Sequence, residues 1–214
     1  MQRKGWCGLA IWRHCLILCS MTNLLPADGD MRLYDDFLGA QQGARCMAAL
    51  EAELQWEQPH IKLFGKSHPT PRLVAWAGAC DYTYSGHTHK AAPLTPTLQH
   101  LWPLVEAKAG AKFNTVLLNL YRSGQDSMGW HADDEAELGQ NPTIASLSLG
   151  APRLFKLRHT TKALKLDVVL PSGSLLVMGG AMQHHWQHAL PKTAKPLPPR
   201  LNLTFRWITP PPAT

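Results

Sequence analysis

From Phe113 onward, apolar and polar residues come in short runs, several of them strictly alternating, which is the pattern of β-strands packed on one face. Turn signals rich in glycine, proline and asparagine separate the runs. Short strands at this spacing predict a jelly roll, or double-stranded β-helix, over residues 113–208. Its narrow interior can hold a small ligand and a metal. The expected strands are residues 113–121, 143–149, 152–157, 166–170, 174–178 and 201–207.

Two helical patterns precede these strands. Leu38 to Trp56 and Leu94 to Ala109 carry apolar side chains at helical spacing, and both are expected to pack on one sheet. The predicted fold class is therefore mostly β with flanking helices (α+β). Pro103 predicts a kink or a break in the second helix, because proline lacks the amide hydrogen that a helix uses.

Residues 1–30 carry the least information. Basic residues precede an apolar patch, but Arg13 and His14 interrupt it and no small-residue cleavage site follows, so a secretory signal is not expected. We expect a poorly structured extension here, with translation from Met21 or Met31 as an alternative. A single domain is expected over residues 31–214.

Composition and charge narrow the class of protein. The 21 basic and 15 acidic side chains give a net charge of +6, which favours a polyanionic partner such as nucleic acid. The five cysteines lack C-x-x-C spacing, which indicates free thiols in a reducing compartment, so we expect a cytoplasmic protein, or a nuclear one in a eukaryote. No run approaches the about 20 apolar residues that cross a bilayer, so no membrane partner is expected. We also expect a monomer.

A candidate metal site begins in the stretch NLYRSGQDSMGWHADD. His131 and Asp133 lie two residues apart, and such residues in an extended chain point to the same face, so both can address one ion. Alone, this pair also fits an exposed turn. A third ligand has to come from later in the chain, where His184, His185 and His188 lie within five residues. Two histidines and one carboxylate form the set that non-haem Fe(II) oxygenases use, with three positions left open.

A strand near the C-terminus adds a candidate anion site. In RLNLTFRW every second residue is apolar, so the polar residues between them share the opposite face. Two arginines on an inward face are costly unless they meet an anion. A dicarboxylic acid meets that need, because a planar guanidinium grips a carboxylate with two parallel hydrogen bonds. The four polar residues are Arg200, Asn202, Thr204 and Arg206.

In their order and spacing these motifs resemble the AlkB family of Fe(II)- and 2-oxoglutarate-dependent dioxygenases, which oxidatively demethylate nucleic-acid bases. The resemblance runs from about Tyr34 to Ile208 and rests on NLYRSGQDSMGWHADDE, on HWQHALP, and on RLNLTFR. It implies that His131, Asp133 and His188 bind Fe(II). It also implies a 2-oxoglutarate pocket lined by Asn119, Tyr121, Arg200, Asn202, Thr204 and Arg206, in which either arginine suits either carboxylate.

The resemblance implies a reaction as well. 2-Oxoglutarate and O2 are the co-substrates, succinate and CO2 are formed, and a hydroxylated N-methyl group is lost as formaldehyde. The expected substrates are N1-methyladenine and N3-methylcytosine in single- or double-stranded DNA, which makes the reaction a direct-reversal repair of DNA alkylation damage. Both bases are cationic, and Asp134 beside Asp133 is expected to stabilise that charge in a partly desolvated pocket.

Residues 60–90 combine short apolar runs with glycines and prolines, which predicts hairpins and loops. In a protein of this family they would form a nucleotide-recognition lid. Phe64 lies between Lys62 and Lys66, a composition that suits a wedge that unstacks a base or fills the gap left by one. The alternative is a strand whose Leu63 or Phe64 belongs to the core. The base pocket is expected to involve Arg72, Tyr82 and Tyr84.

Two other interpretations fit the same residues. A related dioxygenase could act on methylated RNA or on a methylated protein, because its iron core would look the same. A non-catalytic jelly roll could bind a methylated or anionic ligand, since the His-x-Asp pair and a distant histidine also suit Zn(II). Against this binding module, a plain zinc site has no use for Arg200 and Arg206 on an inward face.

Overall fold

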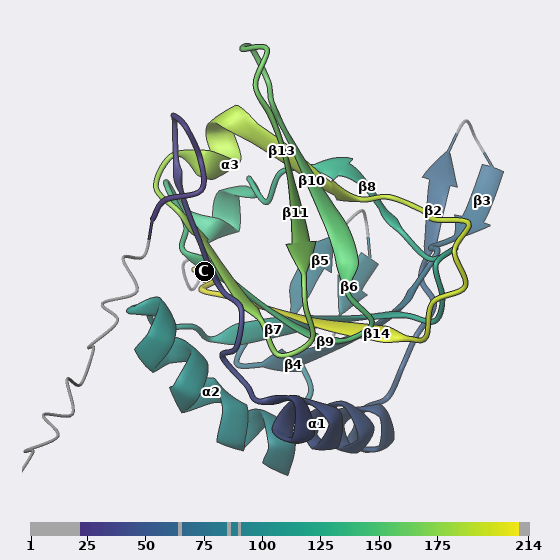
Figure 1. The fold of residues 1–214 in the computed structure, drawn as a ribbon. Helices are drawn as coiled ribbons and strands as arrows, with labels where there is room; N and C mark the ends of the chain where they lie inside the picture. The colour runs from purple at the N-terminus through teal and green to yellow at the C-terminus, as the bar shows by residue number, and fades with distance from the viewer. Residues whose placement is uncertain (1–21, 64–65, 85–86, 90, 210–214) are drawn as a thin grey trace, which may run out of the picture.

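The computed structural model describes residues 22–63, 66–84, 87–89 and 91–209, and Figure 1 shows their arrangement. Two antiparallel sheets face each other and form a jelly roll, which confirms the predicted fold class. Its eight strands are β7 (Thr115–Tyr121), β8 (Met128–His131), β9 (Ile144–Gly150), β10 (Arg153–His159), β11 (Lys165–Leu170), β12 (Leu175–Gly179), β13 (Trp186–Leu190) and β14 (Arg200–Arg206).

The two sheets differ in size. With β1 (Asp30–Tyr34) and β4 (Leu73–Gly78) at its edges, the larger sheet has the strand order β1-β12-β9-β14-β7-β4. The smaller sheet has the order β11-β10-β13-β8. The alternation of apolar and polar residues predicts six of the eight jelly-roll strands and misses β8 and β13, which lie side by side in the smaller sheet.

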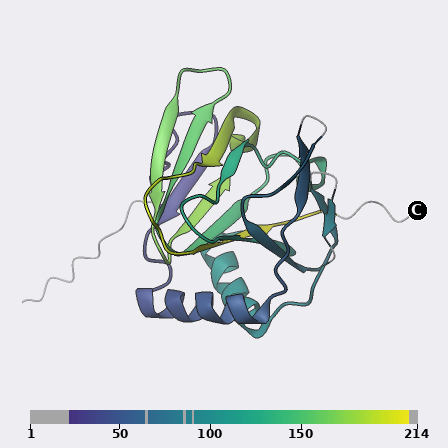
Figure 2. The same cartoon turned by 90° about the vertical axis from the view of Figure 1, so that its right-hand side faces the viewer.

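Two helices, α1 (Ala40–Glu53) and α2 (Pro96–Ala109), cover the outer face of the larger sheet (Figures 1 and 2). The hydroxyl of Thr95 caps α2 by accepting a hydrogen bond from the amide of Leu98 at 3.3 Å. α2 continues through Pro103, so the predicted break does not occur. None of the helices in the described ranges is long and apolar enough to span a membrane.

β14 lies between an apolar core on one face and the space between the two sheets on the other. All seven of its residues are buried. Leu201, Leu203 and Phe205 pack with the apolar side chains of the helices in one core cluster. The polar residues between them point the other way and line the space between the two sheets. The alternation read from the sequence therefore places two arginines inside the protein.

Residues 60–90 contain a core strand as well as hairpins. β4 pairs with β7 along its whole length and buries Val74 and Trp76. The lid predicted over this range is therefore too broad, because only the segments on either side of β4 form separate hairpins. These are β2 (His60–Leu63) with β3 (Lys66–Pro69), and β5 (Tyr82–Tyr84) with β6 (His87–His89). Figure 1 shows β2 and β3 projecting at the side of the jelly roll.

Residues 22–29 pack on the jelly roll, contrary to the expectation of a poorly structured extension up to residue 30. Leu25 is buried. The indole of Trp186 donates a hydrogen bond to the carbonyl of Ala27 at 3.1 Å, and Nε2 of His159 lies 2.9 Å from the carboxylate of Asp28. These partners are distant in sequence, so no local pattern reveals them. The rest of the predicted extension, residues 1–21, lies outside the described residues.

Candidate active site

Two of the predicted ligands face each other across neighbouring strands. His131 ends β8, His188 lies within β13, and the two are directly opposed in the antiparallel ladder. Their ring centroids are 4.2 Å apart. Because opposed side chains of a ladder leave the sheet on the same face, the pairing of β8 with β13 fixes the spacing of the two imidazoles.

Asp133 lies two residues beyond the end of β8 and completes the group. The candidate ligand atoms of His131, Asp133 and His188 all lie within 4.8 Å of one another. Nη2 of Arg206 donates to Oδ1 of Asp133 at 2.7 Å, while Oδ2 faces Nε2 of His188 at 3.9 Å. Burial alone raises the pKa of the Asp133 carboxyl, but the charge of Arg206 and the two imidazoles hold that pKa below its usual value. The carboxylate is therefore anionic, with Oδ2 turned toward the histidines.

Each of the two histidines presents one ring nitrogen that can bind an ion. Nδ1 of His131 lies 2.9 Å from the carbonyl oxygen of Gly129, which can only accept, so Nδ1 donates to it and Nε2 is the nitrogen that can bind an ion. Burial, followed by repulsion from His131, lowers the pKa of His188 to about 3, so this imidazole is neutral. Two imidazoles and one carboxylate fit a divalent iron ion and leave positions on it open.

Arg200 and Asn202 are held by two serines of β9. Nη2 of Arg200 donates to Oγ of Ser148, and Nδ2 of Asn202 donates to Oγ of Ser146, both at 2.8 Å. The guanidinium of Arg200 also lies 5.4 Å from the ring centre of Tyr121. Burial lowers the pKa of Arg200 to about 10, and its Nε has no hydrogen-bond partner among the described residues. A buried cation with an unused donor fits an anionic ligand.

One pocket between the sheets collects all nine residues predicted to bind the metal or 2-oxoglutarate. Its empty space is about 480 Å³, which includes its mouth open to solvent. Two arginines face one carboxylate in it, so it is cationic before a metal binds, and a dianion such as 2-oxoglutarate offsets that charge. Sequence reasoning missed six other lining residues, five of which carry no polar group that marks them out: Met128, Ser146, Phe155, Leu170, Met178 and Leu190.

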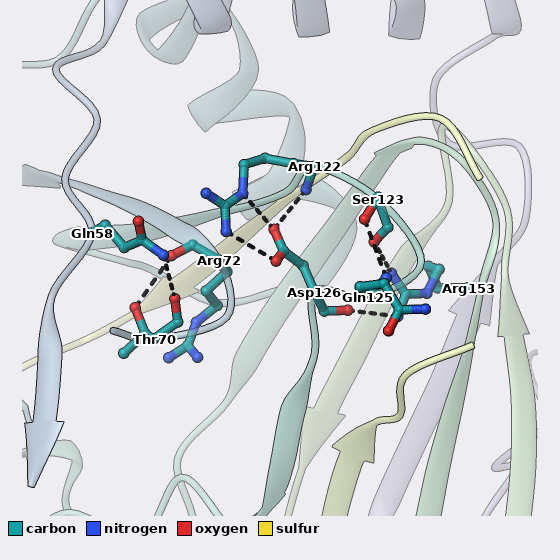
Figure 3. Close-up of polar contacts among 8 residues, drawn as sticks. All are labelled: Gln58, Thr70, Arg72, Arg122, Ser123, Gln125, Asp126 and Arg153. Atoms are coloured by element: carbon teal, nitrogen blue, oxygen red, sulfur yellow. Dashed lines mark hydrogen bonds and ion pairs between the residues drawn. The ribbon is translucent and has the colours of Figure 1, made fainter. Parts of the chain in front are cut away.

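Arg72 lies behind the pocket. It was expected to contact the substrate base, but it is buried and its Nε donates to Oδ1 of Asn119 at 2.8 Å. Its own carbonyl accepts from the hydroxyl of Thr70 at 3.2 Å, as Figure 3 shows. Because Arg72 can only donate, Oδ1 of Asn119 faces Arg72 and the Nδ2 donor of Asn119 faces away from it. In this structure Arg72 orients an amide that lines the pocket.

Arg153 joins the two loops beside the pocket. Its Nη1 donates to the carbonyl of Ser123 at 3.2 Å, and its Nη2 donates to that of Asp126 at 2.9 Å (Figure 3). Nη2 also donates to the carbonyl of Pro191 at 2.8 Å. The guanidinium lies 5.8 Å from the ring centre of Tyr121. The loops that follow β7 and β13 are thereby fixed to each other and to a ring that lines the pocket.

The predicted substrate contacts are less fully described. Asp134 is exposed, in contrast to the partly desolvated setting expected for it. Phe64 lies outside the described residues, and so do the side chains of Lys66, Tyr82 and Tyr84. Their contacts with a base stay predictions.

Comparison with known proteins places this geometry in a family. A sequence model of the 2OG-Fe(II) oxygenase superfamily matches residues 30–206. DNA oxidative demethylase ALKBH2 of Mus musculus is 36% identical over 214 residues, covering 93% of this chain and 84% of that protein. The chain belongs to the AlkB family of 2OG-Fe(II) oxygenases. The cofactor and co-substrates of this superfamily are Fe(II), 2-oxoglutarate and O2, and the donor set described above fits them.

This chain covers different shares of two other AlkB proteins. Alpha-ketoglutarate-dependent dioxygenase alkB homolog 3 of Homo sapiens is 38% identical over an alignment of 190 residues. The match covers 84% of this chain and 66% of that protein, so this chain spans just under two thirds of it. The solved structure of OsALKBH1 superposes with a TM-score of 0.61 at 18% identity and covers 83% of this chain and 96% of that one. At that identity the likeness supports the fold alone.

Proposed function

We propose that this AlkB-family protein is a dioxygenase that demethylates N1-methyladenine and N3-methylcytosine in DNA. The observation that carries the proposal is that His131, Asp133 and His188 line one pocket together with two buried arginines. One O2 and one 2-oxoglutarate are consumed for each methyl group. The products are succinate, CO2, formaldehyde and the unmodified base.

His131, Asp133 and His188 are assigned as the ligands of Fe(II), which when bound supplies the activation of O2 needed to hydroxylate a methyl group. The ladder of β8 and β13 sets the two imidazoles. Arg206 engages Oδ1 of Asp133 and so leaves Oδ2 for the ion. The His188 imidazole is neutral and the Asp133 carboxylate is ionised, which are the protonation states in which these side chains bind a metal.

Each arginine is assigned to one carboxylate of 2-oxoglutarate, according to how close that arginine lies to the metal ligands. Arg206 contacts Asp133, so it suits the carboxylate beside the metal. Arg200 is held by Ser148 and lies against Tyr121, so it suits the distal carboxylate. The buried surroundings strengthen both ion pairs because little water is present to screen them.

Three observations support a cationic base in DNA as the substrate. The net charge of +6 favours a nucleic acid. Asp134 follows the ligand Asp133 and is exposed, where a positively charged base entering from solvent would meet it. The relatives ALKBH2 carry the name DNA oxidative demethylase. A base has to leave the stack to reach the pocket, and a methyl group that already blocks pairing lowers that cost.

The test is formaldehyde release by the purified protein with Fe(II), 2-oxoglutarate and O2. Four substrates are compared: methylated single-stranded DNA, the corresponding duplex, RNA of the same sequence, and a trimethyl-lysine peptide. We expect turnover on DNA to exceed that on RNA, none on the peptide, and none with His131→Ala. Faster turnover on RNA than on DNA would mean that RNA is the preferred substrate. Release from the peptide alone would contradict a nucleic-acid substrate altogether.

The charge of Asp134 is tested separately. Asp134→Asn is expected to lower kcat/KM on N3-methylcytosine about tenfold, since a charge pair near a protein surface contributes on the order of 1 kcal/mol or more. N3-methylthymine is neutral, so its turnover should change little. Glu137→Gln, which removes an exposed acid three residues further on, is the matched control. Equal losses on the cationic and the neutral base would exclude the electrostatic role of Asp134.

A further inference from the structure

The candidate metal site has one ligand whose main chain lies outside the sheet. His131 and His188 are opposed in the ladder of β8 and β13, and β8 ends at His131. Asp133 follows two residues later, beyond the last residue of that strand. Arg206 holds its carboxylate, but a side-chain contact alone does not fix the backbone from which the carboxylate projects. The third ligand therefore needs a restraint that the ladder does not supply.

Gln183 provides such a contact. It lies in the short helix α3 (Met182–His185) and is 2% exposed. Its Oε1 accepts a hydrogen bond from the backbone amide of Asp133 at 3.0 Å. Because a backbone N–H can only donate, this bond sets the orientation of the side-chain amide and turns Nε2 toward Sδ of Met178, 3.9 Å away. Both ends of the Gln183 amide are therefore fixed among buried groups.

We propose that Gln183 is a positioning residue for the metal site. α3 leads directly into β13, the strand that carries His188 (Figure 1). The segment with His131 and Asp133 is thus joined twice to the segment with Gln183 and His188, once through the opposed histidines and once through the hydrogen bond to Asp133. Gln183 does not itself touch the ion. It holds the Asp133 backbone so that Oδ2 stays within reach of the ion that the imidazoles bind.

The test measures metal binding with no co-substrate or nucleic acid present. Co(II) is the probe, because its visible absorption reports both occupancy and ligand geometry. Gln183→Met keeps the length of the side chain but removes the acceptor, and we expect it to raise the Kd for Co(II) about tenfold or more and to alter the absorption spectrum. Gln183→Glu keeps an acceptor oxygen at the same reach and is expected to restore the parent spectrum and most of the affinity.

Gln187→Met is the matched control. Gln187 is the neighbour of His188 on β13, but its Oε1 accepts from Arg158 at 2.7 Å on the other face of the strand, so its loss should leave the Kd unchanged. His131→Ala should abolish the absorption, which locates the ion. Thermal unfolding of each metal-free variant, measured with a chelator, shows that the titrations are made on folded protein. If Gln183→Met does not fold, Gln183→Asn takes its place, because its shorter side chain withdraws the acceptor.

Parent affinity and spectrum in Gln183→Met or its replacement would overturn the proposal. So would a loss of affinity that Gln183→Glu does not reverse, or Co(II) binding that survives His131→Ala. Failure of both the Met and the Asn variants to fold would show that Gln183 supports the fold itself, which also overturns a specific positioning role. The proposal rests on the metal site but not on base demethylation, so either one can fail without the other.

Discussion

Among single residues, Arg200 is a cation that burial disfavours. Removal from water lowers the pKa of its guanidinium to about 10, well below its ordinary value. Among the described residues, its guanidinium donates to the hydroxyl of Ser148 and lies near the ring of Tyr121, and no carboxylate forms a hydrogen bond with it. Replacing a buried charge by an apolar side chain of similar volume is often neutral or stabilising. The position therefore indicates selection for a bound anion rather than for stability.

Arg200→Met is expected to weaken 2-oxoglutarate binding by on the order of 10- to 100-fold, because hydrogen bonds to a charged group contribute roughly 1.5–3 kcal/mol. The free energy of unfolding of the ligand-free protein should not decrease. Isothermal titration with 2-oxoglutarate and Mn(II), together with urea unfolding, measures both. Arg32→Met, which removes an exposed partner of Asp30, is the control. Unchanged 2-oxoglutarate affinity would remove Arg200 from the co-substrate site.

Asp126 makes stability depend on pH. Burial alone raises the pKa of its carboxyl, but hydrogen bonds from the side chain and amide of Arg122, with the charges of Arg122 and Arg153, hold that pKa below its usual value. A carboxyl with a lowered pKa in the fold contributes stability that is present above its unfolded pKa and is lost as the pH falls toward the folded pKa.

Asp126→Asn is accordingly expected to lower the free energy of unfolding at pH 7. The difference from the parent protein should shrink once the pH falls below about 4, the ordinary pKa of an aspartate. Urea unfolding between pH 3 and pH 7 measures it. A difference that stays constant over this range would mean that the ion pair with Arg122 contributes nothing.

Among the elements, the strands that carry the metal ligands are the ones that the sequence pattern hides. β8 reads MGWH and β13 reads WQHAL, and neither alternates. Their histidines occupy inward positions that a structural strand would fill with apolar residues. The alternation of apolar and polar residues is therefore absent from these two strands. β14 keeps its alternation because its outer face still packs on the helices. That is why its arginines could be predicted to point inward.

β4 escaped prediction for a different reason. Its sequence LVAWAG is a continuous apolar run that is buried on both faces, so it shows no alternation, and prolines and a glycine close to it suggest loops. Only its pairing with β7, about forty residues later, identifies it as part of the larger sheet. The same limit applies to Arg72, whose role depends on the position of Asn119 across that pairing.

α2 contains a proline, Pro103, that is expected to destabilise the helix. Pro103 is exposed in the helix interior, where it removes one backbone hydrogen bond. Pro103→Ala is expected to raise the free energy of unfolding by about 1–2 kcal/mol, which is the gain in helix propensity less the greater freedom of the unfolded chain.

Urea unfolding of this variant is compared with that of Pro96→Ala, because Pro96 opens α2, where a proline costs little. No gain at position 103, or an equal gain at both positions, would contradict this account of α2.

In the whole molecule, the pocket exists because the two sheets face each other. β8 and β13 of the smaller sheet bring the histidines, while β7, β9 and β14 of the larger sheet bring the polar residues opposite them. Motif order in the sequence identifies the residues that would touch the metal and 2-oxoglutarate. It does not identify Ser146, Ser148 or Gln183, which hold those residues in place, because their contacts join segments fifty or more positions apart.

The most direct test of the central claim is the ratio of formaldehyde to succinate released from DNA that contains N3-methylcytosine. If the pocket couples 2-oxoglutarate to demethylation, the parent protein with Fe(II) and O2 should release the two products in equal amounts, and His131→Ala should release neither. Succinate without formaldehyde would mean that the pocket works as an oxygenase on another substrate. Formaldehyde that persists in His131→Ala would contradict the assignment of the site itself.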